Sequence, residues 1–270
     1  RRTHKPEVSG SIPLPATNHM NKKYYIELIL TKVFIILVPL FLIQGHICKY
    51  RKPEFCKIFF FDNFWEENGF IENFQSLLLF LAILLLLKSY LKIANFNLIK
   101  IFLFLKIIAL IYFLGEEISW GQHFFKWSSP SLFLELNNQE ETNLHNISNL
   151  FDQLPRTLVM LWCIFCPLIF LLLKKNLNLN LIIIRPTFIL SYISILLFVL
   201  IVPDLLIDKL NLHPGHVDQF GKDIYEAKFY DLITFNFIRL SELHELIFAF
   251  YFFIYSYSLS KLDLVTRKIN

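Results

Sequence analysis

Residues 98–123 read LIKIFLFLKIIALIYFLGEEISWGQH, an apolar run that is followed directly by two adjacent carboxylates, Glu116 and Glu117. A helix needs about 20 mostly apolar residues to cross the hydrocarbon core of a bilayer, and the run approaches that length. A carboxylate at the edge of such a span loses hydration, so it usually pairs, binds an ion or takes part in chemistry. The stretch therefore predicts a membrane helix with a polar site at one end.

The composition extends this prediction to the whole chain. Of its 270 residues, 55% are hydrophobic, whereas soluble domains have ~45–50%. Apolar runs such as FQSLLLFLAILLLL and YISILLFVLIV are far longer than a buried strand needs. We expect helices that lie on the membrane interface in two of the loops, 118–155 and 203–236, which the orientation argued below places outside. The sequence thus predicts an all-α polytopic membrane helix bundle of about six transmembrane helices, at 24–45, 73–94, 98–115, 157–173, 185–202 and 237–259.

Residues 1–19 differ from the rest of the chain. They are polar and rich in proline, and they lack the apolar core of a secretory signal. The pair His19-Met20 also resembles a cloning junction. We interpret 1–19 as a tag-like segment and expect 20–270 to form a single transmembrane domain.

The distribution of basic residues predicts an orientation. With the N-terminus inside, the short inner segments are rich in Lys and Arg, as cytoplasmic loops are, whereas the outer loop 116–155 has only Lys126. We therefore expect a multi-pass protein of the plasma (inner) membrane with N-in and C-in topology. These inner lysines explain the net charge of +4, so no nucleic-acid partner is expected. The inner basic residues are Lys22, Lys23, Lys88, Lys92, Lys100, Lys174, Lys175, Lys261, Arg267 and Lys268.

The cysteines fall into two pairs. Cys48 and Cys56 both lie in the first predicted outer loop, where an oxidising compartment permits a disulfide. Two cysteines this close also occur without bonding, so the sequence leaves their state open. Cys163 and Cys166 form CIFC inside the fourth predicted span, where a zinc or redox site is disfavoured.

Polar residues from distant segments are predicted to meet at the outer end of the bundle. Glu116 and Glu117 end the third span, while Glu242 and Glu245 are three residues apart and share a face at the start of the last. In the structural alternative, Glu–Arg pairs at this interface only fix helix packing. The number of carboxylates favours a functional site, because Ser or Asn would lose less on desolvation. The predicted catalytic residues are Glu116, Glu117, His145, Arg239 and Glu242.

The segment 118–155 combines aromatic and hydrogen-bonding residues, a composition typical of the membrane interface. Glu141 and His145 are four residues apart, so on a helix they would share a face and could bind a divalent metal or form an acid–base pair. A surface ion pair is the simpler alternative. The segment is also a candidate surface for a protein partner. The predicted contacts to substrate or membrane lipids are Trp120, Gln122, Trp127, Asn143, Asn146 and Arg156, and the candidate metal ligands are Glu141, His145 and Glu245.

Four blocks within 66–245, namely ENGFIENFQ, GEEISWGQ, NLHN and RLSELHE, resemble a family of bacterial multi-pass membrane proteins without an assigned activity. GEEISWGQ together with NLHN is the specific part of this resemblance. It implies that the polar blocks belong together, and it implies no reaction. The glutamate pair is also similar to the EExxxR signature of CAAX-type intramembrane proteases, but Trp120 and Gly121 stand where that signature has its arginine.

Two classes of function fit these features. In the first, the protein is an enzyme at the outer leaflet that acts on a lipid or lipid-linked substrate. Glu116 and Glu117 would be bases or metal ligands, His145 would shuttle protons, and Arg239 would bind an anionic headgroup. In the second, it is a non-catalytic assembly or partner-binding subunit. A transporter fits less well, because no internal repeat is evident and the inner half of the predicted bundle has few polar residues beyond lysines.

Overall fold

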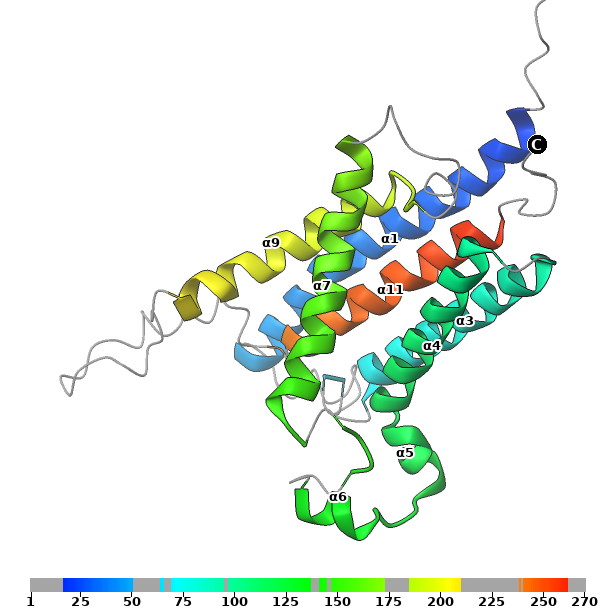
Figure 1. Ribbon diagram of the computed structural model, residues 1–270. Helices are drawn as coiled ribbons and strands as arrows, with labels where there is room; N and C mark the ends of the chain where they lie inside the picture. Colours follow the sequence, from blue (N-terminus) through cyan, green and yellow to red (C-terminus); the bar gives the residue numbers. More distant parts are fainter. Residues whose placement is uncertain are drawn as a thin grey trace, which may run out of the picture.

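The computed structural model describes residues 17–50, 64–65, 69–94, 97–136, 141–144, 147–172, 185–209, 238 and 240–261. The regular elements within these residues are all helical, which confirms the all-α prediction (Figure 1). The long helices are α1 (Thr17–Tyr50), α3 (Phe70–Lys92), α4 (Leu98–Glu117), α7 (Asn149–Leu172), α9 (Leu190–Lys209) and α11 (Leu240–Ser260). The short ones are η1 (Ser119–Gly121), α5 (Gln122–Phe125) and α6 (Ser131–Leu136).

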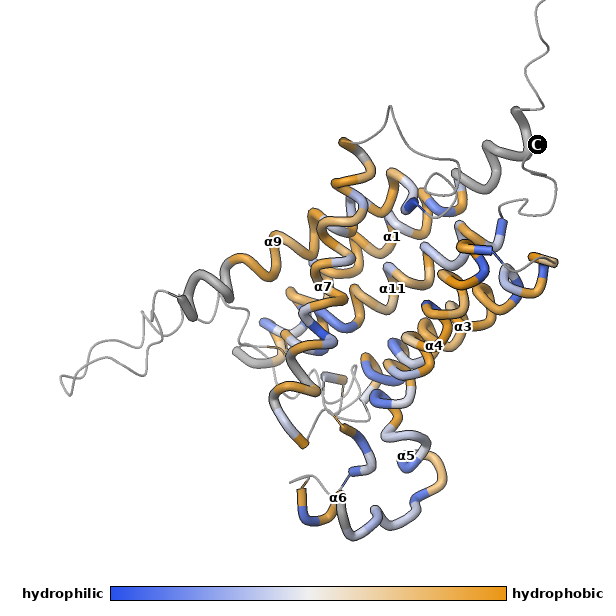
Figure 2. Tube along the Cα trace, in the orientation of Figure 1, coloured by the Kyte–Doolittle hydropathy of each residue, from blue (hydrophilic) through white to orange (hydrophobic). Residues whose placement is uncertain are grey.

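Among the described residues, three helices are long and apolar enough to cross a membrane, namely α1 over Tyr25–Cys48, α3 and α4. Shorter apolar stretches lie in α7 and α9. Figure 2 shows hydrophobic residues along the lengths of these helices. Large apolar side chains such as Leu91 and Leu105 are exposed, and extensive apolar exposure of this kind is typical of a surface that faces lipid.

The starts of α7 and α9 differ from the predicted spans, as do the start of α1 and the end of α9. The helix α9 begins at Leu190 and not at 185, because residues 185–189 form a bend and a turn around Pro186, and a proline disfavours helical geometry in the residue before it. The helix α7 begins at Asn149, ahead of the predicted 157. Beyond Lys209, the helices predicted within 203–236 fall outside the described residues.

The connection between α3 and α4 is fixed by local hydrogen bonds. The side chain of Asn97 accepts a hydrogen bond from the backbone N–H of Lys100 (2.9 Å), so it caps the N-terminus of α4. Lys100 Nζ in turn donates to the carbonyl of Ile93 (2.9 Å), just after α3 ends. These bonds hold the end of α3 beside the start of α4, and the two helices pack together.

The helix α11 lies at the centre of the bundle and is buried along most of its length. Helices α1, α3, α7 and α9 pack against it (Figure 1). Gln75 Nε2 donates to the carbonyl of Glu242 (2.8 Å), and Lys92 Nζ donates to the carbonyl of Ser260 (3.2 Å). Because these bonds join start to start and end to end, α3 and α11 run in the same direction. We call the end of the bundle at Glu242 the site end and the end at Ser260 the far end.

The C-terminal end of α1 lies at the site end. Trp65, which precedes α3, donates a hydrogen bond from Nε1 to Gln44 Oε1 of α1 (3.0 Å). Cys48, one turn further along α1, is disulfide-bonded. Cys56 lies outside the described residues, and the two cysteines of α7 are free thiols.

Candidate functional site

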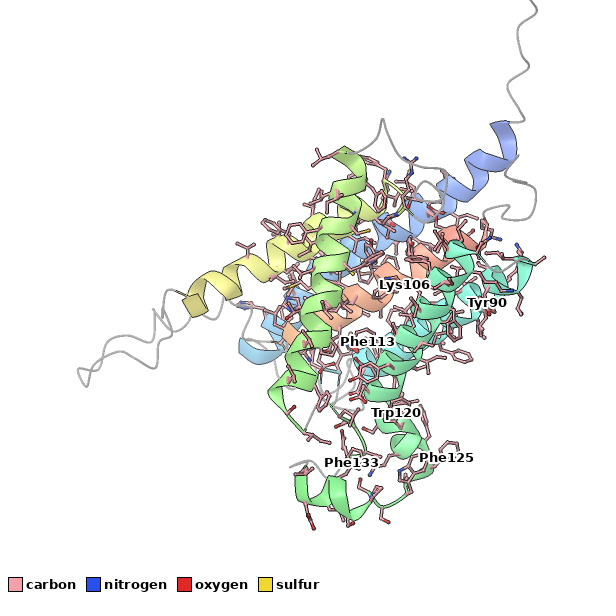
Figure 3. All side chains as sticks on the ribbon, in the orientation of Figure 1. Tyr90, Lys106, Phe113, Trp120, Phe125 and Phe133 are labelled. Atoms are coloured by element: carbon pink, nitrogen blue, oxygen red, sulfur yellow. The ribbon has the colours of Figure 1, made fainter. Side chains whose placement is uncertain are left out.

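The chain reverses direction sharply where α4 ends. Ser119, Trp120 and Gly121 have φ angles of 44°, 55° and 100°, in the left-handed region that favours glycine. The Trp120 ring packs onto Gly115, where an added Cβ would lie 2.9 Å from the ring. Glycine at position 115 therefore allows Trp120, labelled in Figure 3, to return over the last turns of α4.

Glu116 connects this turn to a distant segment. Its Oε1 accepts a hydrogen bond from Trp120 Nε1 (2.9 Å), and its Oε2 accepts one from the backbone N–H of Leu144 (2.7 Å). The side chain is only 6% exposed, and hydrogen bonds to a carboxylate are strong away from water. Glu116 therefore holds the segment 141–144 against the end of α4.

A second set of hydrogen bonds joins the same two segments. Ser119 Oγ donates to Glu141 Oε2 (3.0 Å), and Asn143 Nδ2 donates to the same oxygen (2.6 Å). Asn143 is buried. The carboxylate of Glu141, a predicted metal ligand, is thus engaged in holding the turn.

Further from α4, Gln122 bridges both sides of the loop. Its Oε1 accepts hydrogen bonds from the backbone N–H (2.7 Å) and the hydroxyl (2.9 Å) of Thr142, and its Nε2 donates to Ser129 Oγ (3.0 Å). Trp127 Nε1 also donates to the Thr142 hydroxyl, over 3.4 Å. We call the described residues 118–136 and 141–144 the arm. Figure 1 shows the arm, with α5 and α6, extending beyond the helices of the bundle.

The arm uses its polar groups internally and turns aromatic rings outward. Phe124 and Phe125 are 62% and 77% exposed. The ring of Phe125 stacks on that of Trp127, with 5.8 Å between centroids. Four predicted contact residues therefore lie together in the arm, but the polar atoms described above hold the arm's own structure. These four are Trp120, Gln122, Trp127 and Asn143.

Glu117, the next residue along α4, belongs to a different group. Its carboxylate interacts electrostatically with those of Glu245, Glu242 and Glu72 and, with the opposite sign, with Arg156. These partners come from α11, α3 and α7, so helices distant in sequence converge on the end of α4. We call Glu72, Glu117, Glu242, Glu245 and Arg156 the carboxylate cluster.

An ion pair joins two members of the cluster, and Gln75 of α3 hydrogen-bonds to a third. Arg156 Nη2 forms an ion pair with Glu245 Oε1. Gln75 Nε2, which bonds to the carbonyl of Glu242, also lies 3.3 Å from Glu242 Oε2, and the Glu242 side chain is buried. The charge of Arg156 also acts on His244. Arg156, a predicted contact to substrate or membrane lipids, is thus paired with Glu245 of α11 within the cluster.

The cluster is chemically suited to acid–base work. Neighbouring carboxylates in a poorly hydrated site bind protons with different affinities, so that one can act as an acid while another acts as a base. A guanidinium group binds carboxylate or phosphate with two parallel hydrogen bonds. Both kinds of group come from different helices, so the packing of the bundle sets their relative positions.

Some predicted site residues are not placed. His145, Asn146 and Arg239 lie outside the described residues. Within the part of the chain that the structure describes, no group of three or more His, Cys, Asp or Glu side chains could hold a metal ion. Glu141 bonds inside the arm and Glu245 pairs with Arg156, so these two candidate ligands have separate partners.

Two residues of this region belong to the block ENGFIENFQ but are not among the predicted site residues. Glu72 lies in the first turn of α3 and Gln75 lies one turn later. The sequence carried a signal for Glu72, because this residue opens one apolar run and Glu117 closes the next. Consecutive antiparallel helices place such residues at the same end of a bundle.

Comparisons with known proteins give no relative. No protein-family model matches the chain, and no curated protein or solved structure is significantly similar to it. Its function is therefore inferred from the carboxylate cluster and the arm.

Proposed function

We propose that the chain is a multi-pass protein of the plasma (inner) membrane, with six crossings, both termini inside and the site end outside. The long helices α7, α9 and α11 pack with the three helices that are long and apolar enough to span a membrane. Basic residues gather at the far end, where Lys88 and Lys92 end α3, Lys100 begins α4 and Lys261 follows α11. This excess supports a cytoplasmic far end.

The disulfide of Cys48 supports the same orientation. Cys48 lies near the end of α1, at the site end of the bundle. Disulfides persist in oxidising compartments and are rare in the cytosol. A site end outside the cell satisfies this requirement together with the distribution of lysines.

We further propose that the protein is an enzyme acting at the outer leaflet on a lipid or lipid-linked substrate. The observation that carries this proposal is the set of charges around Glu117, where three carboxylates and one arginine arrive from three other helices. A packing role needs no such accumulation of like charge, because polar uncharged residues would be less costly to bury. Glu117 would be the acid–base residue and Arg156 would help to bind an anionic headgroup.

The arm favours a second function, the binding of a protein partner. Its hydrogen bonds hold a defined surface that presents Phe124 and Phe125 to the surroundings. Exposed aromatic residues are common at the centre of protein interfaces. Under the enzyme proposal the same rings would instead lie among the acyl chains and headgroups beside the site.

Lipid profiles of cells expressing matched variants test the enzyme proposal. Cells carry the wild type, Glu117→Gln or Glu135→Gln, the last of which changes an exposed carboxylate on α6. We expect at least one lipid or lipid-linked species to rise or fall with the wild type and with Glu135→Gln, and to stay at the level of the empty vector with Glu117→Gln. Mass spectrometry of whole lipid extracts gives the measurement.

Identical profiles for the three proteins and the empty vector, at equal membrane expression, would argue against catalysis and for the partner-binding function. The partner-binding function has its own test. Replacing Phe124 and Phe125 by Ser should abolish cross-linking to a partner protein in the membrane and leave the melting temperature of the purified protein unchanged.

A further inference from the structure

Buried polar atoms without a hydrogen-bond partner occur at several levels of the bundle. Within the described residues they include Gln75 Oε1, Tyr251 OH, Thr31 Oγ1 and Ser256 Oγ. Each of these four side chains is at most 1% exposed. An unbonded polar atom in a membrane interior is unfavourable. In native structures such atoms commonly mark bound water or an ion.

The atoms lie at different levels along the central helix α11. Gln75 bonds to Glu242 at the site end. At the rise of an α-helix, Tyr251 lies roughly 13 Å and Ser256 roughly 21 Å further along α11. Unbonded polar atoms therefore occur near the site end, in the middle and in the far half of the bundle.

The middle level contains a lysine within the bundle. Lys106 Nζ lies 3.4 Å from the ring centroid of Trp162 and 5.4 Å from that of Phe252. The indole nitrogen of Trp162 also lacks a hydrogen-bond partner. The thiol of Cys163 lies close to both Lys106 and the phenol of Tyr251. A cation and a phenol thus lie in one group where α4, α7 and α11 meet.

The far half contains a buried carboxylate. Glu27 on α1 is 1% exposed and lies one turn from Thr31. Its charge acts on Tyr257 of α11. On the other side of Thr31, the ring of Phe34 stacks on that of Phe250, with 3.8 Å between centroids. Glu27 and Thr31 therefore lie along the contact between α1 and α11.

We propose that these residues line a hydrated proton path that winds around α11 from the carboxylate cluster, past Tyr251 and Lys106, to Glu27. Carboxyl, phenol and hydroxyl groups pass protons through water molecules that are hydrogen-bonded between them. One proton enters at one end for each proton that leaves at the other, and only O–H and N–H bonds change. Proton movement along this path begins at the carboxylate cluster but needs no catalysis there.

The structural alternative is that the hydroxyls only bond to their own helices, as serines in membrane helices often do. Ser89 Oγ bonds to the carbonyl of Leu85 (3.0 Å), and Ser260 Oγ bonds to that of Tyr257 (2.8 Å). The hydroxyls of Tyr251 and Ser256 make no such bond. The alternative therefore explains Ser89 and Ser260, and it does not explain the unbonded hydroxyls of Tyr251 and Ser256.

Proton flux into liposomes that contain the purified full-length protein tests the proposal. The vesicles enclose a pH-sensitive dye, and a potassium gradient with valinomycin drives protons across the membrane. We expect the wild type to carry protons several-fold faster than protein-free vesicles. Tyr251→Phe and Glu27→Gln should each slow this flux several-fold. Tyr192→Phe, which removes an exposed phenol from α9, is the matched control and should conduct like the wild type.

A wild-type flux no faster than that of protein-free vesicles would overturn the proposal. Equal flux in the wild type, Tyr251→Phe and Glu27→Gln would also overturn it. Tyr251→Phe removes only an unbonded hydroxyl, so its fold should survive. Gel filtration and melting in detergent check every variant, and Thr31→Val replaces Glu27→Gln if the latter aggregates.

Discussion

Glu116 and Glu117 are identical side chains on adjacent residues, and they have different surroundings. Neighbouring residues of an α-helix point about 100° apart, so they face different parts of the structure. Both oxygens of Glu116 accept hydrogen bonds that hold the arm. Glu117 instead lies among the charges of the carboxylate cluster. The two residues should therefore respond oppositely to loss of charge.

Glu116→Gln should destabilise the fold, whereas Glu117→Gln should leave stability unchanged or raise it. An amide at position 116 turns one acceptor into a donor that faces either the Leu144 N–H or the Trp120 N–H. Such a buried mismatch costs about 1–3 kcal/mol. An amide at position 117 removes repulsion from three carboxylates. Melting temperatures in the same detergent measure both effects, and an equal fall for the two variants would contradict this division.

Gly115→Ala should lower the melting temperature. The new methyl group would lie 2.9 Å from the Trp120 ring, and overpacking of this kind costs about 1–3 kcal/mol. The ring would have to move away from Glu116, which would weaken the bond to Trp120 Nε1. Ala109→Leu, an enlargement at an exposed position of the same helix, is the control and should melt like the wild type. A fall for the control equal to that of Gly115→Ala would mean that any enlargement of α4 is harmful.

At the scale of the element, the apolar helices could be predicted and the arm could not. Long apolar runs specify helices by length and hydrophobicity alone, so the predicted spans overlap the long helices. The arm depends on left-handed angles at Ser119, Trp120 and Lys126, which no local preference of these residues predicts. It also depends on bonds between positions 20 or more apart, such as Gln122 to Thr142. Only the folded chain brings these partners together.

The arm should lie at the depth of the lipid headgroups. The helix α4 has 20 residues, which at the usual rise span about 30 Å, the thickness of the hydrocarbon core. The residues that follow it therefore begin at the interface. The part of the tryptophan fluorescence that Trp127→Phe removes should be quenched by lipids labelled near the headgroup more strongly than by lipids labelled at the chain end. Equal, weak quenching by both would place the arm in water and favour a protein partner.

At the scale of the whole molecule, segment order predicts which residues share an end of the bundle, and it does not predict the inward faces. Glu117, Glu242 and Arg156 were expected at one end because each lies where an apolar run begins or ends. Glu27 and Ser256 are not among the predicted site residues, and the sequence predicts few polar residues beyond lysines in the inner half of the bundle. Glu27 and Ser256 are both buried. When a single polar residue stands in an apolar run, the sequence does not indicate which side of the helix faces the protein interior.

Cysteine labelling should establish the orientation of the bundle. Glu135→Cys adds a thiol on the exposed α6 of the arm, and Lys261→Cys adds one at the exposed far end. The lysines of the far end favour the cytoplasm, and the disulfide of Cys48 favours an oxidising compartment for the site end. A membrane-impermeant maleimide should thus label Glu135→Cys on intact cells and Lys261→Cys only after permeabilisation. The protein without an added cysteine is the blank, and the reverse pattern would place the carboxylate cluster on the cytoplasmic side.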